Sequence, residues 1–240
     1  MYSLVHTNDE RFPFSLYVDD SRLQEVESAA SMLDFVLADV TIQAVERMED
    51  HVALHAAAAA WDRRGIIFPG QPDSGKTTLV AGLTQVGFAY LSDEAALIDP
   101  HTGLLHPFPR ALAMDARSVD AIPGLRRKLP PDHDQFMRSR YHVPPDDLRP
   151  GAVGRPCRVK YVIAPKYEAG GDTELKPMSR AEALMTLAEN SFNFVRFGSL
   201  AVDSLRGTLE GVKCYRLRIG SLEDGIRKVL DVVEEGAYAR

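Results

Sequence analysis

The chain has little cysteine and no long apolar run. Its 240 residues include two cysteines, Cys157 and Cys214, too few for a disulfide framework or a cysteine metal site. No apolar stretch approaches the roughly 20 residues that cross a bilayer. Residues 1–20 also lack the basic-then-apolar pattern of a secretory signal. We therefore expect no membrane partner and a cytoplasmic location.

Positive charge is scarce in the chain as a whole. Lysine and arginine number 28 against 34 acidic residues, for a net charge of −6, and an acidic protein is a poor general binder of nucleic acid. Segment 122–160 is the exception, because it holds nine basic and four acidic residues and is rich in proline. We expect a long, partly irregular arm there, whose Arg126, Arg127 and Lys128 either grip a charged ligand or stay solvated.

Residues 70–77 fit the pattern G-x-x-x-x-G-K-[ST] of loops that bind nucleotide phosphates. A short β-prone run precedes them and a run with helical apolar spacing follows. In such a strand–loop–helix, glycines let successive N–H groups point into one hollow, and the helix start adds partial positive charge. We expect Lys76 to reach the β- and γ-phosphates and Thr77 to ligate Mg²⁺. The sequence thus predicts ATP and Mg²⁺ as cofactors, held by Gly70, Gln71, Pro72, Asp73, Ser74, Gly75, Lys76, Thr77 and Thr78.

The pattern around this loop predicts alternating strands and helices in one large domain. Residues 1–25 predict one or two short strands, and 25–49 a helix with Leu33, Val36, Leu37 and Val40 on one stripe. We expect an antiparallel pair from 52–61 and 65–68, in spite of its alanine run. Further strands are expected at 88–91, 96–99, 103–106, 159–163 and 215–219, and helices after Ser179 and Ser221. The expected parts are an appendage (1–50), a nucleotide-binding core (51–121), the basic arm (122–158) and a C-terminal α/β part (159–240).

Two adjacent acids follow the strand after the loop. Asp93 and Glu94 lie 17 and 18 residues after Lys76, a gap that one helix and one strand fill. Ligands of open α/β sheets bind at the carboxyl ends of strands, and phosphoryl transfer needs both metal binding and a group that takes the acceptor's proton. Two carboxylates could divide these tasks, although a solvated acidic turn is the alternative.

The order of these features resembles the HPr serine kinase/phosphorylase family over about residues 50–115. The resemblance rests on Leu54-His55-Ala56 before the loop, on the loop itself and on Tyr90-Leu91-Ser92-Asp93-Glu94 after it. Pro107-Phe108-Pro109-Arg110 is similar to HPr-kinase-related proteins found near peptide-modification genes. The resemblance implies an α/β core with a mixed, β-rich sheet and flanking helices, like that of phosphoenolpyruvate carboxykinase.

The resemblance also implies roles for single residues. Asp93 would take the acceptor's proton, Glu94 would lie near Mg²⁺, and His55 would be an active-site histidine beside them; without the resemblance His55 would be a core residue. Asp115 and Arg117 fall roughly where the family has a further acid and arginine, and Arg110 is a candidate substrate contact.

The expected activity is transfer of phosphate from ATP to a serine hydroxyl of a peptide or protein. The glycine-rich signature of the HPr enzymes is missing, so the related kinases of lasso-type precursor peptides are the closer comparison. A small-molecule kinase and a nucleotide-binding regulatory protein stay open, as do the acceptor and a homo-oligomeric state.

Overall fold

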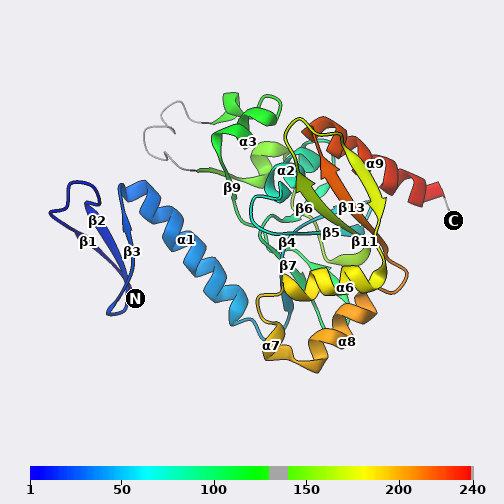
Figure 1. Cartoon of the computed structure of the whole chain (residues 1–240), viewed down its shortest axis with the longest axis horizontal. Helices are drawn as coiled ribbons and strands as arrows, with labels where there is room; N and C mark the ends of the chain where they lie inside the picture. Colours follow the sequence, from blue (N-terminus) through cyan, green and yellow to red (C-terminus); the bar gives the residue numbers. More distant parts are fainter. Residues whose placement is uncertain (130–139, 239–240) are drawn as a thin grey trace.

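One large mixed β-sheet with helices on both faces forms the body of the protein (Figure 1). The computed structural model of the chain describes residues 1–129 and 140–238, so the middle of the predicted arm lies outside the described residues. The eight strands of this sheet are β4 (Val52–Trp61), β5 (Arg64–Pro69), β6 (Ala89–Ser92), β7 (Ala95–Ile98), β8 (Leu104–His106), β11 (Cys157–Tyr167), β12 (Glu174–Pro177) and β13 (Lys213–Ile219).

The strand order along the sheet is β12-β13-β11-β5-β4-β7-β8, and β6 pairs with β4 beside β7. β11 runs parallel to both β5 and β13, whereas every other pairing in this sheet is antiparallel. The predicted α/β class with a mixed sheet and flanking helices is therefore confirmed, as are the predicted hairpins 52–68 and 96–106.

The alanine run in β4 is a strand because both faces of the sheet are buried there. Ala57 and Ala59 belong to the core on one face, and Ala56, Ala58 and Ala60 to the core on the other. Alanine favours helix in isolation, but these small side chains let the helix layers approach the sheet, so packing overrides the local preference.

Four helices supply most of the two outer layers. α2 (Lys76–Gln85) and α9 (Leu222–Tyr238) contribute to the core on one face of the sheet. α6 (Arg180–Glu189) and α8 (Ser199–Thr208) cover the other face, and the short α7 (Phe194–Phe197) lies before α8. The predicted capping box opens α6, since Ser179 and Glu182 exchange side-chain and backbone hydrogen bonds. Cys157 and Cys214 are free and buried.

The described part of the predicted arm packs against α2. It contains the 3₁₀ turn η1 (Arg126–Lys128), β10 (Tyr141–Val143) and α5 (Pro145–Leu148), and it follows β9 (Leu112–Met114) and α3 (Ala116–Ala121), which end the predicted core. β9 and β10 pair antiparallel. Their apolar residues join the same core cluster as Leu79 and Leu83 of α2, so apolar contacts hold both ends of this segment.

The N-terminal part is an antiparallel three-stranded sheet on a long helix, and Figure 1 shows it projecting from the body. Its elements are β1 (Tyr2–His6), β2 (Phe14–Val18), β3 (Ser21–Val26) and α1 (Ala29–Glu46). Met32 and Val36 pack on this sheet, but Leu33, Leu37 and Val40 of the predicted stripe are exposed. Successive residues are rotated by about 100° around a helix, so this stripe faces beside the sheet instead of onto it. Among the described residues, no helix is long and apolar enough to cross a membrane.

Candidate active site

The phosphate-binding loop connects the end of β5 to the start of α2. Asp73 and Gly75 have φ angles of 63° and 89°, and Gly75 precedes α2 without any side chain capping the helix. The Leu79 N–H donates to the Gly75 carbonyl at 2.9 Å, so the N–H groups of the three residues before Leu79 have no acceptor within the helix. These donors and the positive end of the helix dipole suit an anion.

Small residues and one unpaired hydroxyl line this loop. A Cβ on Gly70 would lie 2.8 Å from Ser74 Oγ, and one on Gly75 would lie 3.2 Å from the Tyr167 Cβ. Ser74 Oγ is buried without a hydrogen-bond partner among the described residues. An unpaired buried hydroxyl is costly unless a ligand or water satisfies it. The loop therefore fits a group that accepts hydrogen bonds, such as a phosphate.

Lys76 is buried at the first turn of α2. Its ammonium group donates to the carbonyls of Gly70 at 2.6 Å and Gln71 at 2.9 Å. Burial lowers the pKa of Lys76, while the nearby carboxylates of Glu94, Asp73 and Asp93 raise it. Lys76 is thus held by the loop itself and lies in the electrostatic field of the predicted acid pair.

The register of β4 brings the acids to the loop. β6 pairs with Ala58–Ala60 of β4 and β7 pairs with Val52–His55, so the chain passes from β6 to β7 along one edge of β4. Asp93 and Glu94 are the two residues of this passage, and the Ala56 N–H donates to the Glu94 carbonyl at 3.2 Å. On its other edge, Ala56 pairs with Pro69, next to the start of the loop. The expected juxtaposition of acids and loop follows from these two pairings.

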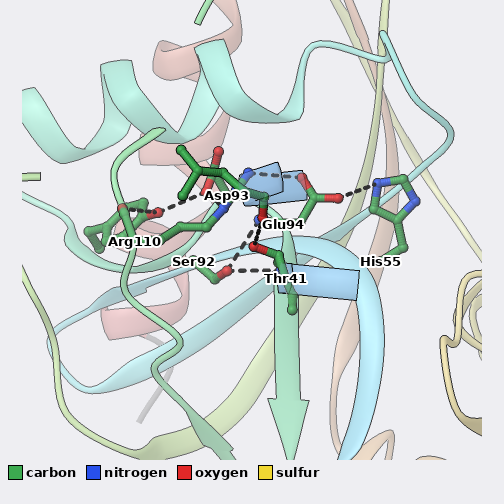
Figure 2. A network of polar contacts seen from close by, with 9 residues as sticks. Thr41, His55, Ser92, Asp93, Glu94 and Arg110 are labelled. Atoms are coloured by element: carbon green, nitrogen blue, oxygen red, sulfur yellow. Dashed lines mark hydrogen bonds and ion pairs between the residues drawn. The ribbon is translucent and has the colours of Figure 1, made fainter. Parts of the chain in front are cut away.

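Arg110 binds both acids at once (Figure 2). Its Nε donates to Asp93 Oδ1 at 3.3 Å and its Nη2 donates to Glu94 Oε2 at 3.1 Å. The Tyr90 hydroxyl also donates to Asp93 Oδ1, at 3.0 Å. The Asp93 side chain is 1% exposed, and that of Glu94 is 32% exposed. Glu94 is therefore the carboxylate open to a ligand, and Asp93 lies beneath it.

The pKa of Asp93 is set by opposing effects. Burial raises the pKa of Asp93, and the Arg110 guanidinium and the Tyr90 hydroxyl act against that rise. The same buried contact raises the pKa of Tyr90, mainly through desolvation and then through the charge of Asp93. Arg110 is thus the cation that offsets the negative charge of Asp93.

His55 lies on β4 between the loop and the acids. Its Nε2 is 3.5 Å from Glu94 Oε1, and its ring lies 5.5 Å from that of Phe192. Burial, and then the Lys76 charge, lower the pKa of His55 to about 4. The imidazole is therefore neutral at pH 7, and its contact with Glu94 joins a neutral ring to a carboxylate.

Several candidates from the sequence have structural partners away from the acid pair. The Asp115 carboxylate caps α3 by accepting the Ser118 N–H at 2.7 Å, and the Thr78 hydroxyl donates to Ser118 Oγ at 2.8 Å. Arg117 is exposed.

Two basic residues of the arm, Arg126 and Lys128, bind groups in or just before their own segment. Arg126 donates to Asp120 at 2.9 Å and to the Tyr141 hydroxyl. Lys128 donates to the Asp147 carbonyl at 2.7 Å, and Arg127 is exposed. Within the described part of the arm, none of these contacts reaches the phosphate loop.

The sequence alone did not indicate the roles of Tyr90 and Arg110 in holding the acid pair. Arg110 was predicted only as a substrate contact, and Tyr90 only as part of a strand. The available signal was a tyrosine three residues before Asp93 with an arginine after a Pro-Phe-Pro turn. Such spacing does not reveal that β6 and the 107–111 segment lie side by side.

No group of three or more His, Cys, Asp or Glu side chains in residues 1–129 and 140–238 could hold a metal ion. The Thr77 hydroxyl has no hydrogen-bond partner within that part of the chain, and Glu94 is partly open. These oxygens suit Mg²⁺, which usually binds few protein groups together with substrate phosphates.

No protein-family model matches the chain, and no curated protein matches it.

Proposed function

We propose that the protein is an ATP-dependent kinase that phosphorylates a hydroxyl, with a serine of a peptide or protein as its acceptor. The proposal takes the loop 70–77, the acid pair and His55 as one phosphoryl-transfer site of the HPr-kinase type. Its single carrying observation is that β4 brings the two parts together: Ala56 pairs with Pro69 on one edge and donates to the Glu94 carbonyl on the other, and the neighbouring His55 Nε2 lies 3.5 Å from Glu94 Oε1.

The loop residues bind and orient the nucleotide in this proposal. Lys76 exchanges its two loop carbonyls for phosphate oxygens, where its charge offsets the negative charge of the transferring group. Ser74 Oγ and the free N–H groups of α2 supply further donors. Thr77 and Glu94 would hold Mg²⁺, which supplies charge neutralisation of the phosphates when bound.

The acids act on the acceptor. Asp93 takes the hydroxyl proton, as the family resemblance implies, and it reaches an acceptor only if the Arg110 side chain moves aside, because Asp93 is covered. Neutral His55 donates to Glu94 and keeps that carboxylate oriented toward the loop. Proton removal by a positioned group accelerates such reactions by about 10²–10⁴-fold.

A small-molecule kinase is the second candidate. It is favoured by one observation, which is that Arg126 and Lys128 bind their own segment and so leave less charge to grip an extended acidic peptide. In this alternative the acids bind the hydroxyl of a sugar or another metabolite.

In the test, the purified chain is incubated with labelled ATP, Mg²⁺ and one of two acceptor sets. These sets are serine-containing peptides and hydroxylated metabolites. The proposal expects alkali-labile phosphoserine to form on peptides, with little product from metabolites. Faster labelling of a free metabolite would move the assignment to the second candidate. Tight ATP binding with no transfer to either set would identify a nucleotide-binding regulatory protein instead.

A further inference from the structure

α1 presents an apolar stripe that no part of the described chain covers. Leu33, Leu37 and Val40 are 53%, 42% and 46% exposed. A helix packed on one sheet usually turns charged and polar side chains to water. On a face of such a helix that the sheet does not cover, large apolar residues in a row indicate a missing partner.

The face of α1 that packs on its own sheet is separate from this stripe. Met32 and Val36 contribute to the core with β2 and β3. Farther along the same face, Asp39 accepts a hydrogen bond from the Tyr2 hydroxyl at 2.5 Å and one from Gln43 at 2.6 Å. The exposed stripe is therefore an additional surface, and the fold of the N-terminal part does not use it.

The spacing of the stripe is that of a helix pair. Leu33, Leu37, Val40 and Ala44 follow one another at intervals of four, three and four residues, and Ala44 is exposed too. Alternating intervals of three and four place side chains along the seam between two packed helices. Phe35 and Ile42 of α1 are also exposed, at 43% and 39%, but they are seven residues apart and lie on another side of the helix. Among the described helices, α1 alone exposes large apolar residues at alternating intervals of three and four, so the partner that fits is a helix with the same seam.

We propose that the stripe formed by Leu33, Leu37, Val40 and Ala44, termed the α1 seam, is the interface of an antiparallel homodimer in which α1 of one chain packs on α1 of a second copy.

The antiparallel direction follows from side-chain sizes and dipoles. A twofold axis between residues 37 and 40 sets Leu37 against the partner's Val40, and Leu33 against the partner's Ala44, so that a large side chain meets a smaller one at each end. The two helix dipoles then oppose each other, which is the favourable arrangement. No seam position is ionised. In this register the nearest acid, Asp34, stands opposite residue 43 of the second copy, a glutamine, so pairing sets no like charges against each other there.

The area available predicts a dimer of modest affinity. Three large side chains, each about half exposed, offer on the order of 250 Å² of apolar surface per copy, whereas a standard interface buries about 800 Å² per partner in total. The seam and its flanks supply only part of the area of a standard interface. We therefore expect a dissociation constant in the micromolar range rather than an obligate dimer.

The test measures the mass of the full-length chain by light scattering and sedimentation from about 1 to 100 µM. The expected result is a concentration-dependent rise from the 26.5 kDa of one chain to twice that value. The double variant Leu37→Lys/Val40→Lys should raise the dissociation constant at least about hundredfold, because it places four charges in the seam and lysine retains helix propensity.

The matched control is Val202→Lys on α8. Val202 is 41% exposed, close to the value for Leu37, but it does not belong to a row of exposed apolar residues spaced three and four apart. It should leave the dimer unchanged. A wild-type chain that stays at 26.5 kDa throughout the range overturns the proposal, as does a dimer that survives the double variant. Circular dichroism and thermal unfolding of both variants check that each chain is folded.

Disulfide crosslinking tests the direction of the pair. The two native cysteines are buried, so Leu37→Cys and Val40→Cys each introduce one exposed thiol. An equimolar mixture of the two variants should crosslink at least about tenfold faster than either variant alone, because residues 37 and 40 face each other in the antiparallel pair. Faster crosslinking of Leu37→Cys by itself contradicts this pairing.

Discussion

Removing the guanidinium of Arg110 should destabilise the fold more than any exposed arginine does. In Arg110→Met, the buried carboxylate of Asp93 loses its cation while a side chain of similar length fills the space. Breaking a buried ion pair by removing one partner costs about 3–5 kcal/mol. Arg110 is 21% exposed and the Tyr90 hydroxyl still donates to Asp93, so we expect the lower end, about 3 kcal/mol.

Arg227 provides a matched control. It also bridges two adjacent acids, Glu223 at 3.0 Å and Asp224 at 3.2 Å, but its side chain is 61% exposed. Arg227→Met should therefore cost no more than about 0.5 kcal/mol, as exposed pairs do. The free energies of unfolding come from urea denaturation followed by circular dichroism.

The stability difference between Arg110→Met and wild type should depend on pH, and this dependence identifies Asp93 as the group responsible. The pKa of Asp93 is already raised in the folded protein, and loss of Arg110 raises it further. The folded variant then holds a proton that the unfolded chain releases, so its stability falls as pH rises. The destabilisation by Arg110→Met should shrink toward pH 5 and grow toward pH 8. Equal costs for Arg110→Met and Arg227→Met at pH 8 would refute a charged Asp93 held by Arg110.

Three further predictions concern the same site and the arm. Lys76→Ala should weaken ATP binding in calorimetry at least about tenfold, since it removes a cation from the phosphates; unchanged affinity would remove the argument from the loop. The pKa of His55 is about 4 in the folded chain and near 6.5 in the unfolded chain, so the wild-type free energy of unfolding falls as pH drops between these values. His55→Gln should remove about 2 kcal/mol of that fall. Reversal of Arg127 and Lys128 to Glu should raise the peptide KM at low salt and leave ATP binding nearly unchanged. A peptide KM that does not move would show that this part of the arm has no ligand.

Local patterns predicted the elements around the loop well. The glycines and Lys76 define a strand–loop–helix over a few residues, and Ser179 with Glu182 defines a helix start. Strand pairing was harder to predict, because β4 pairs with β7 and β6 on one edge through residues that are 29 to 46 positions apart in the sequence. The loop and acids were identified by their residue types, whereas the bridge from Arg110 to both acids depends on that pairing.

The stripe on α1 shows a second limit of sequence patterns. Periodicity predicted that Leu33, Val36, Leu37 and Val40 share one stripe, but Val36 packs on the N-terminal sheet, while the other three share an exposed face. It could not predict that this face is exposed, because the same pattern serves a helix packed on its own core and a helix that pairs with another chain. Only the position of the β1–β3 sheet, which takes the neighbouring face of the helix, distinguishes the two.

The most direct test of the central claim separates ATP binding from phosphoryl transfer in Asp93→Asn. If the loop 70–77 and the acid pair form one kinase site, this variant should bind ATP as wild type does in calorimetry. Its transfer of labelled phosphate to a serine peptide should fall by at least about a hundredfold. Asparagine keeps the size of the side chain, and unfolding measurements confirm that the fold is intact. Undiminished transfer by a folded Asp93→Asn would contradict the account.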